Sequence, residues 1–185
     1  RHLDRAEWVA RFVRTRRRSE RLPVFRREFV LDRLPSGAVL RSTFLGVGKV
    51  WINGVVVGDE LLEPGWQSYG HRLAYRTSDV RSLLAVGRNV IEAEVAPGWY
   101  SGRLGFFEQR EIYGSDLAVL AQLDVQADGE WNPLVWTDES WTWRNGPTLA
   151  ADLYDGETYD ARRADPSTAD GLPVELVAFD TGLLE

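Results

Sequence analysis

Four acidic side chains in one short segment, DLYDGETYDAR, are the residues best suited to chemistry: Asp152, Asp155, Glu157 and Asp160. Their carboxylates could bind Ca²⁺, a hard cation that takes about six to eight oxygen ligands. The spacing differs from that of an EF-hand loop, which places acids at alternate positions before its Gly. Two of these acids could instead form an acid/base pair across a sugar. The remaining interpretation is a polar segment neutralised by Arg162 and Arg163 at a domain boundary.

Three aromatic residues follow Pro-Gly pairs and are expected on loops beside strands: Trp66, Trp99 and Tyr100. A flat indole at the edge of a β-sandwich can stack on the apolar face of a sugar ring, as it does on a base. Trp is also common in cores and at interfaces. The three residues are therefore candidates for carbohydrate binding or for contact with another domain. Trp51 lies within an expected strand, and we predict that it is in the core.

Several kinds of catalytic site are excluded by composition and spacing. The chain has no Cys, and its only histidines are His2 and His71, so thiolate sites and multi-histidine zinc sites are absent. The Gly-rich stretch 98–105, GWYSGRLG, lacks the GK[ST] ending of a phosphate-binding loop. No G-x-S-x-G nucleophile elbow is present. No catalytic residue is therefore assigned from these motifs.

Charge and hydropathy narrow the range of partners. A net charge of −6 argues against nucleic-acid binding, and we expect the basic run 14–18, RTRRR, to be a solvated loop before the first strand. No apolar run approaches the ~18 residues that span a bilayer, and no signal-peptide pattern is present, so we expect no membrane contact. The lack of Cys fits either a cytoplasmic or a secreted protein. The absence of an initiator Met predicts an excised piece of a larger protein.

The elements that would position these residues are mostly short strands. Apolar residues occupy alternate positions over 117–125 and 89–95, which predicts two half-buried strands. Asn53-Gly54 and Asp128-Gly129 each separate two apolar runs, and such pairs tolerate the positive φ angles of a type I′ hairpin turn.

One short helix is predicted, with Asp79 as its N-cap and Gly87 as its stop. Many short strands without βαβ alternation predict an all-β, antiparallel two-sheet sandwich. We expect residues 1–165 to form this domain and residues 166–185 to form a linker and the start of a following domain. The apolar pattern at 174–179 is expected to have no pairing partner within the chain.

A family resemblance rests on an ordered series of segments, which extends over residues 5 to 165: 51–58 (WINGVVVG), 62–69 (LEPGWQSY), 98–102 (GWYSG), 137–141 (TDESW) and 152–162 (DLYDGETYDAR). This series resembles the N-terminal jelly-roll domain, a galactose-binding-like sandwich, of bacterial α-L-rhamnosidases. Only the Asn-Gly hairpin and the stretch from Asp79 to Asn89 are shared with sugar-binding sandwiches of other glycosidases.

The resemblance implies a non-catalytic accessory domain. In that family an (α/α)-barrel domain further along the chain carries the catalytic carboxylates and releases terminal L-rhamnose with inversion. The implied partners are the downstream β and (α/α)-barrel domains of the same chain, which this domain would contact or orient. The alternative is a carbohydrate-binding module for rhamnosylated glycans, with Ca²⁺ as a candidate cofactor. A related sandwich in some rhamnosidases binds rhamnose through Ca²⁺, but its ligands have no residue-by-residue match here.

Overall fold

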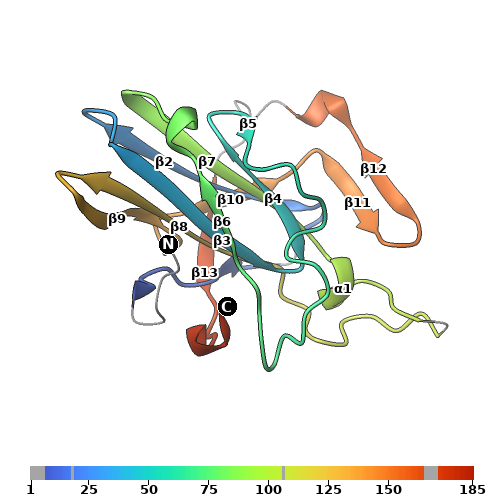
Figure 1. Ribbon diagram of the computed structural model, residues 1–185. Helices are drawn as coiled ribbons and strands as arrows, with labels where there is room; N and C mark the ends of the chain where they lie inside the picture. The colour runs from blue at the N-terminus through green and yellow to red at the C-terminus, as the bar shows by residue number, and fades with distance from the viewer. Residues whose placement is uncertain (1–6, 18, 106, 165–170) are drawn as a thin grey trace.

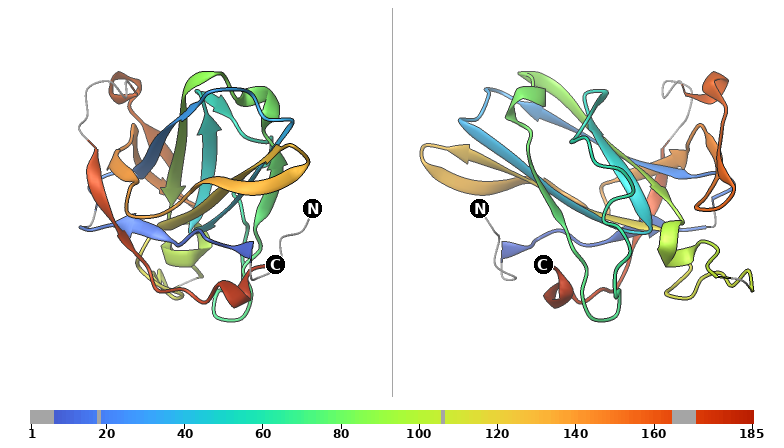
Figure 2. Two further views of the ribbon diagram at one scale, coloured as in Figure 1. Left: turned by 90° about the vertical axis from the view of Figure 1, so that its left-hand side faces the viewer. Right: turned by 45° about the vertical axis from the view of Figure 1, so that its right-hand side comes forward.

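The computed structural model describes residues 7–17, 19–105, 107–164 and 171–185 (Figure 1). Antiparallel strands form two layers, which are seen edge-on in the left view of Figure 2. The first layer holds, in spatial order, β5 (Val55–Val56), β4 (Val47–Ile52), β7 (Gly87–Ala96), β2 (Pro23–Leu31) and β10 (Thr142–Asn145). The second holds β1 (Val13–Thr15), β8 (Ala118–Ala127), β3 (Gly37–Leu45) and β6 (Arg76–Asp79), with β9 (Glu130–Trp136) paired to β8. The antiparallel sandwich predicted from the sequence is confirmed.

The two layers are continuous through β13 (Leu172–Leu176). Pro173 of this strand pairs with Thr142 of β10, and Val174 pairs with Thr15 of β1. The expectation that residues 174–179 lack a partner is therefore wrong: Val174 is buried in the core between the layers. Residues 165–170 of the predicted linker lie outside the described residues.

The two Asn/Asp-Gly turns have the expected geometry. Asn53 and Gly54 have φ angles of 52° and 79°, and Asp128 and Gly129 have φ angles of 52° and 86°. Positive φ at both central residues is the requirement of a type I′ turn, whose twist matches that of the strands it joins. The local sequence therefore sets the register of β4 with β5 and of β8 with β9.

The strand β8 differs from its prediction because both of its faces are buried from Ala118 to Asp124. The odd-numbered side chains enter the core between the layers, as alternation predicts. On the other face, Asp124 forms a buried ion pair with Arg41 of β3. The amide oxygen of Gln122 accepts hydrogen bonds from the backbone N–H groups of Val9 and Ala10 at 2.9 and 3.2 Å. The N-terminal segment thus covers a polar face that alternation alone assigns to solvent.

The predicted helix between Asp79 and Gly87 is wrong in type and length. It is a single 3₁₀ turn, Arg81–Leu83, although the Asp79 carboxylate accepts a hydrogen bond from the Arg81 N–H at 3.0 Å, as an N-terminal cap would. The turn ends early because the Asn89 side chain bonds to both the N–H and the C=O of Ala85 and leads the chain into β7. The α-helix of the described chain is α1 (Gly98–Ser101), in the Gly-rich stretch.

The remaining elements lie at the periphery. β11 (Thr148–Asp152) and β12 (Gly156–Tyr159) form a separate hairpin, coloured orange at the right of Figure 1. Two further 3₁₀ turns are Ala161–Arg163 and Thr181–Leu183. The last residues return to the sandwich, where Leu184 is buried. No helix in the described part of the chain is long and apolar enough to cross a membrane.

Candidate functional site

Two of the predicted aromatic residues lie together at the surface. The rings of Trp66 and Trp99 are parallel to within 7°, with their centroids 6.5 Å apart. Trp66 lies on the long loop between β5 and β6 and is 60% exposed, whereas Trp99, in α1, is half-buried. The indole Nε1–H of Trp66 donates a hydrogen bond to the hydroxyl of Tyr113 at 3.0 Å. Tyr113 was not among the candidates, since nothing in its local sequence indicates a contact with residue 66.

Tyr100 has a different position from its neighbour Trp99. Its side chain is only 8% exposed and packs edge-on against Tyr69, with centroids 5.0 Å apart. Tyr69 in turn lies 5.0 Å from Tyr113. Burial raises the pKa of the Tyr69 and Tyr100 hydroxyls, and the pKa of Tyr69 rises to about 12. Tyr100 is therefore part of the core that supports the exposed aromatic side chains.

The four acidic candidates are distributed along the β11–β12 hairpin and its exit. Asp152 accepts hydrogen bonds from the N–H groups of Tyr154 and Asp155 and lies 3.6 Å from a guanidinium nitrogen of Arg103 and 3.4 Å from one of Arg110. Although burial opposes the effect, these hydrogen bonds and charges lower the pKa of Asp152. Asp155 binds Arg103 at 2.7 Å.

The last two acids are separated from this pair. Asp160 accepts hydrogen bonds from Arg162 and Arg163 at 2.8 and 3.1 Å, and the bond from Arg162 is the main cause of its lowered pKa. The side chain of Glu157 is exposed on β12. Within the described residues, no three His, Asp or Glu side chains are grouped so as to hold a metal ion. Three of the four carboxylates therefore form ion pairs with arginines. This agrees with the interpretation of the segment as a polar stretch whose charges are neutralised by arginines.

The loop 102–115 connects the hairpin to the aromatic pair. Its Arg103 lies over the ring of Tyr154, 5.1 Å from the centroid, and the N–H of Gly105 donates to the Tyr154 hydroxyl at 3.3 Å. At the other end of the loop, Tyr113 binds Trp66. We call this continuous surface the aromatic flank: the loop residues 61–66, the loop 102–115, and the β11–β12 hairpin. Its exposed large side chains are Leu61, Leu62, Trp66, Phe107, Ile112, Tyr113, Tyr154 and Tyr159.

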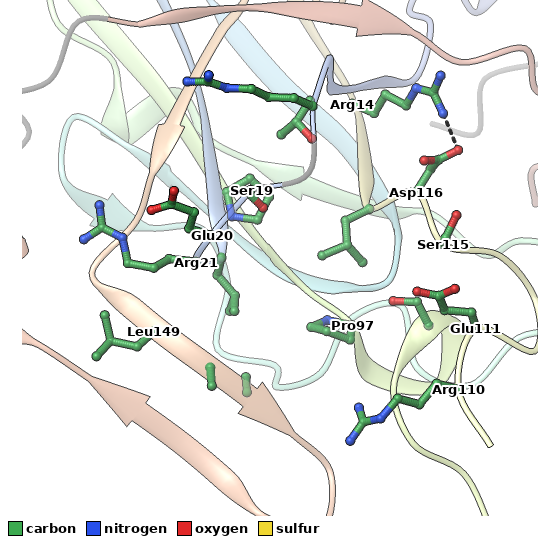
Figure 3. A pocket seen from close by; sticks show the side chains of 18 of the residues that line it. Arg14, Ser19, Glu20, Arg21, Pro97, Arg110, Glu111, Ser115, Asp116 and Leu149 are labelled. Carbon is green, nitrogen blue, oxygen red and sulfur yellow. Dashed lines mark hydrogen bonds and ion pairs between the residues drawn. The ribbon is translucent and has the colours of Figure 1, made fainter. Parts of the chain in front are cut away.

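A polar recess of about 700 Å³ opens where the N-terminal basic run meets the loop 102–117 (Figure 3). Arg14, in β1, is ion-paired with Asp116 and lies 3.0 Å from a carboxylate oxygen of Glu175. Although partial burial opposes the effect, the two carboxylates raise the pKa of Arg14. These ion pairs neutralise Arg14, and the recess is also lined by charged side chains of both signs: Arg16, Arg17, Glu20, Arg21, Arg110 and Glu111. The basic run expected as a loop is partly a strand.

A more apolar groove of about 480 Å³ lies between β4, β7 and the β11–β12 hairpin. Trp51 lines it, so the prediction that Trp51 belongs to the core is wrong: the side chain is half-buried on the outer face of β4. Alternation along β4 predicts this outward position. Val50 and Ile52 face the core, so Trp51 must face the same side as Lys49.

These features define a class of protein: a small antiparallel sandwich with an extended aromatic flank, typical of an accessory domain. A family model described as the α-L-rhamnosidase N-terminal domain matches residues 34–170, which is more than half of the chain. The chain therefore belongs to the family of α-L-rhamnosidase N-terminal domains, and the resemblance found in the sequence is confirmed.

Individual relatives agree with this assignment. The chain is 44% identical over 129 residues to an α-L-rhamnosidase of Streptomyces avermitilis, a match that covers 69% of this chain and 12% of that protein. The crystal structure of the Aspergillus terreus α-L-rhamnosidase superposes with a TM-score of 0.88 at 36% identity, over 95% of this chain and 22% of that one. The structure of the S. avermitilis enzyme complexed with L-rhamnose gives a TM-score of 0.78 at 38% identity, over 86% and 16%. The chain thus spans less than a quarter of each of these proteins.

Proposed function

We propose that this chain is a non-catalytic module of an α-L-rhamnosidase, and that its aromatic flank packs against the downstream β and (α/α)-barrel domains of the same polypeptide. The observation that carries the proposal is the continuity of the flank, in which Arg103, Tyr113 and Tyr154 join two loops and a hairpin into one surface. Large exposed apolar patches on soluble domains mark interaction sites. The parent enzyme would hydrolyse terminal α-L-rhamnosyl bonds with catalytic carboxylates of the barrel domain.

The hairpin supports this role by its exposed second strand. All four residues of β12 are exposed, and among the described residues β11 and β12 pair as strands only with each other. Thr148 of β11 accepts a hydrogen bond from the Leu22 N–H and donates one to Glu94, so β11 is held to the sandwich. A neighbouring domain that covers the exposed Tyr154 would bury part of the hairpin surface that remains open to solvent.

The same geometry weakens the case for Trp66 and Trp99 as a sugar platform. A sugar ring stacks on the face of the indole, and the polar edge of the indole can add a hydrogen bond to a sugar hydroxyl. In Trp66 that Nε1–H is already donated to Tyr113. The pair is better suited to burial in an interface, where Trp and Tyr are enriched and often contribute most of the binding energy.

A chimera tests the proposal. Residues of this chain replace the matching 129-residue region of the S. avermitilis enzyme, and hydrolysis of a chromogenic rhamnoside and the melting temperature are measured. We expect Phe107→Asp and Trp66→Ser to lower the melting temperature by several degrees and to reduce activity. The matched control is Val86→Ser, whose side chain is 62% exposed, close to the 60% of Trp66, but lies outside the flank. Equal effects of the flank and control variants would contradict the proposal.

A further inference from the structure

The groove between the first layer and the β11–β12 hairpin has the features of a small-molecule site. Its floor is the outer face of β4 and β7, and its wall is the hairpin, with Leu153 and Tyr159 turned toward it. A volume of about 480 Å³ is within the range of roughly 300–1,000 Å³ for ligand pockets. Such pockets are mostly apolar with a few polar groups that fix the ligand's orientation.

Strand register places three functional side chains together on the floor. Lys49 of β4 is the direct partner of Glu94 of β7, and Trp51 is two residues from Lys49 on the same face. Directly opposed side chains in an antiparallel pair have Cβ atoms about 5 Å apart. The strand register thus places the ammonium of Lys49, the carboxylate of Glu94 and the indole of Trp51 on one face of the sheet. Their spacing is similar to the width of a sugar ring.

Glu94 carries the polar part of the argument. Its carboxylate is partly buried, and burial is the largest cause of its raised pKa. Among the described residues, the Thr148 hydroxyl is the hydrogen-bond donor to this carboxylate, at 3.1 Å on Oε1. Oε2 lies close to Gly146, so further donors would reach this carboxylate from the side on which Glu94 lines the groove. Ligand hydroxyl groups would supply those donors.

Lys49 complements Glu94. It is the single lysine of the chain, it is exposed, and it forms no ion pair with any residue that the structure describes. Its ammonium can donate to a hydroxyl oxygen whose own hydrogen is donated to a carboxylate. The groove lining carries one cation, Lys49, and three carboxylates, those of Glu94, Asp152 and Glu157. Because acidic groups are in excess, the groove favours a neutral ligand with hydroxyl donors over a phosphate or a polyanion.

We propose that this groove binds the pyranose ring of a neutral sugar, with Trp51 against the apolar face of the ring and Lys49 and Glu94 on adjacent hydroxyls. Neither Trp66 nor Trp99 lines this groove, although Leu62 and the hairpin belong both to its lining and to the aromatic flank. Sugar binding here goes beyond the interdomain role proposed above. An indole placed beside a buried carboxylate allows one face of the sugar to be apolar and one edge to be hydrogen-bonded.

The single lysine makes the test selective. Reductive methylation with ¹³C-formaldehyde labels Lys49 and the α-amine, and the signal that is missing from a Lys49→Arg variant identifies Lys49. The 185-residue chain is titrated with L-rhamnose and with D-galactose up to about 100 mM, which saturates a site with a Kd near 1 mM. We expect saturable shifts of the Lys49 methyl signal and of the Trp51 indole signal with at least one of the two sugars. Sorbitol, a polyol without a ring, is expected to cause no saturable shift.

Variants distinguish this site from the flank. We expect Trp51→Ala and Glu94→Gln each to weaken binding at least tenfold, and Trp66→Ala to leave the Kd unchanged within twofold. Glu94→Gln keeps the shape of the side chain, so it tests the site even if Trp51→Ala fails to fold. No saturable shift with either sugar, or binding that Trp66→Ala abolishes and Glu94→Gln does not alter, would overturn the proposal. The chimera result is independent of both outcomes, because the variants compared there leave the groove floor intact.

Discussion

The indole of Trp66 and the phenol of Tyr113, 47 positions apart in the sequence, are joined by a hydrogen bond of 3.0 Å. The bond connects the long loop before β6 to the loop after α1. Tyr69, packed between Tyr113 and the buried Tyr100, supports both loops from below. The exposed aromatic flank is therefore attached to the core through a series of aromatic rings in edge-on and tilted contact.

Tyr113→Phe should loosen this attachment without unfolding the domain. The variant loses one hydrogen bond at a solvent-exposed site, so we expect about 0.5 kcal/mol or less of global stability to be lost. We expect a clear shift of the Trp66 indole N–H signal and faster hydrogen exchange in the loop 102–115. The control is Tyr159→Phe, which removes an exposed hydroxyl on β12. It should change neither the Trp66 indole N–H signal nor hydrogen exchange in the loop 102–115. An unchanged Trp66 signal in Tyr113→Phe would contradict the hydrogen bond.

Arg103 should hold the hairpin against the loop 102–115. Its guanidinium contacts Asp152 and Asp155 and lies over the ring of Tyr154. Arg103→Gln should therefore increase hydrogen exchange and protease cleavage in β11 and β12, while protection in β7 and β8 stays the same. Arg33→Gln removes an ion pair with Asp128 in which both side chains are largely exposed, and it serves as the control. Equal cleavage of the hairpin in both variants would mean that Arg103 does not hold it.

The sequence predicts those elements whose conformation depends on residues close together in the chain. The type I′ turns at Asn53-Gly54 and Asp128-Gly129 and the alternation of β7 depend on neighbours in the chain, and each is found in the structure. The errors arise where distant segments cover a face. Gln122 and Asp124 have the polarity of exposed residues, but the N-terminal segment buries them.

The same reason explains the limits of the site prediction. Trp66 and Trp99 could be singled out because they follow Pro-Gly pairs, whereas Tyr113 and Arg103 gain their roles from partners more than 40 residues away. Glu94 looks like an ordinary outward acid on a half-buried strand. Only the return of the β11–β12 hairpin over that face turns it into the floor of a groove.

The buried ion pair of Arg41 and Asp124 should be important for stability. Both side chains are almost wholly buried, and the amide of Gln122 also donates to Asp124 at 3.1 Å. Asp124→Leu should cost about 3 kcal/mol or more, because it leaves a buried guanidinium without this carboxylate. The double replacement Arg41→Leu with Asp124→Leu should cost less than the sum of the single changes. Urea unfolding measures all four states of the cycle, and additive costs would contradict the coupling.

Ca²⁺ should have no effect on the stability of this chain. Asp152, Asp155 and Asp160 are paired with arginines, so a cation would have to displace those side chains. A ligand at 100 times its Kd raises the unfolding free energy by about 2.7 kcal/mol, which is several degrees in melting temperature. We expect the same melting temperature in millimolar CaCl₂ and in EDTA. A rise with Ca²⁺ that Asp152→Asn removes would restore the metal-site interpretation.

Glu94 should make the domain less stable as the pH rises through the titration range of its carboxyl group. Burial raises the folded-state pKa of Glu94 above its unfolded value of 4.5. The unfolded state therefore releases this proton at a lower pH than the folded state does. The contribution of Glu94 to the free energy of unfolding falls as the pH rises from the pKa of the unfolded state to the pKa of the folded state, and it stays low at higher pH.

Glu94→Gln removes this charge, and its amide oxygen can still accept a hydrogen bond from Thr148. We expect the variant to gain stability relative to the wild type at pH 7 and to gain less at pH 4, as measured by urea unfolding. An equal difference at both pH values would show that the carboxylate is not held in a desolvated position, and the groove would then lack the acceptor on which its sugar-binding role depends.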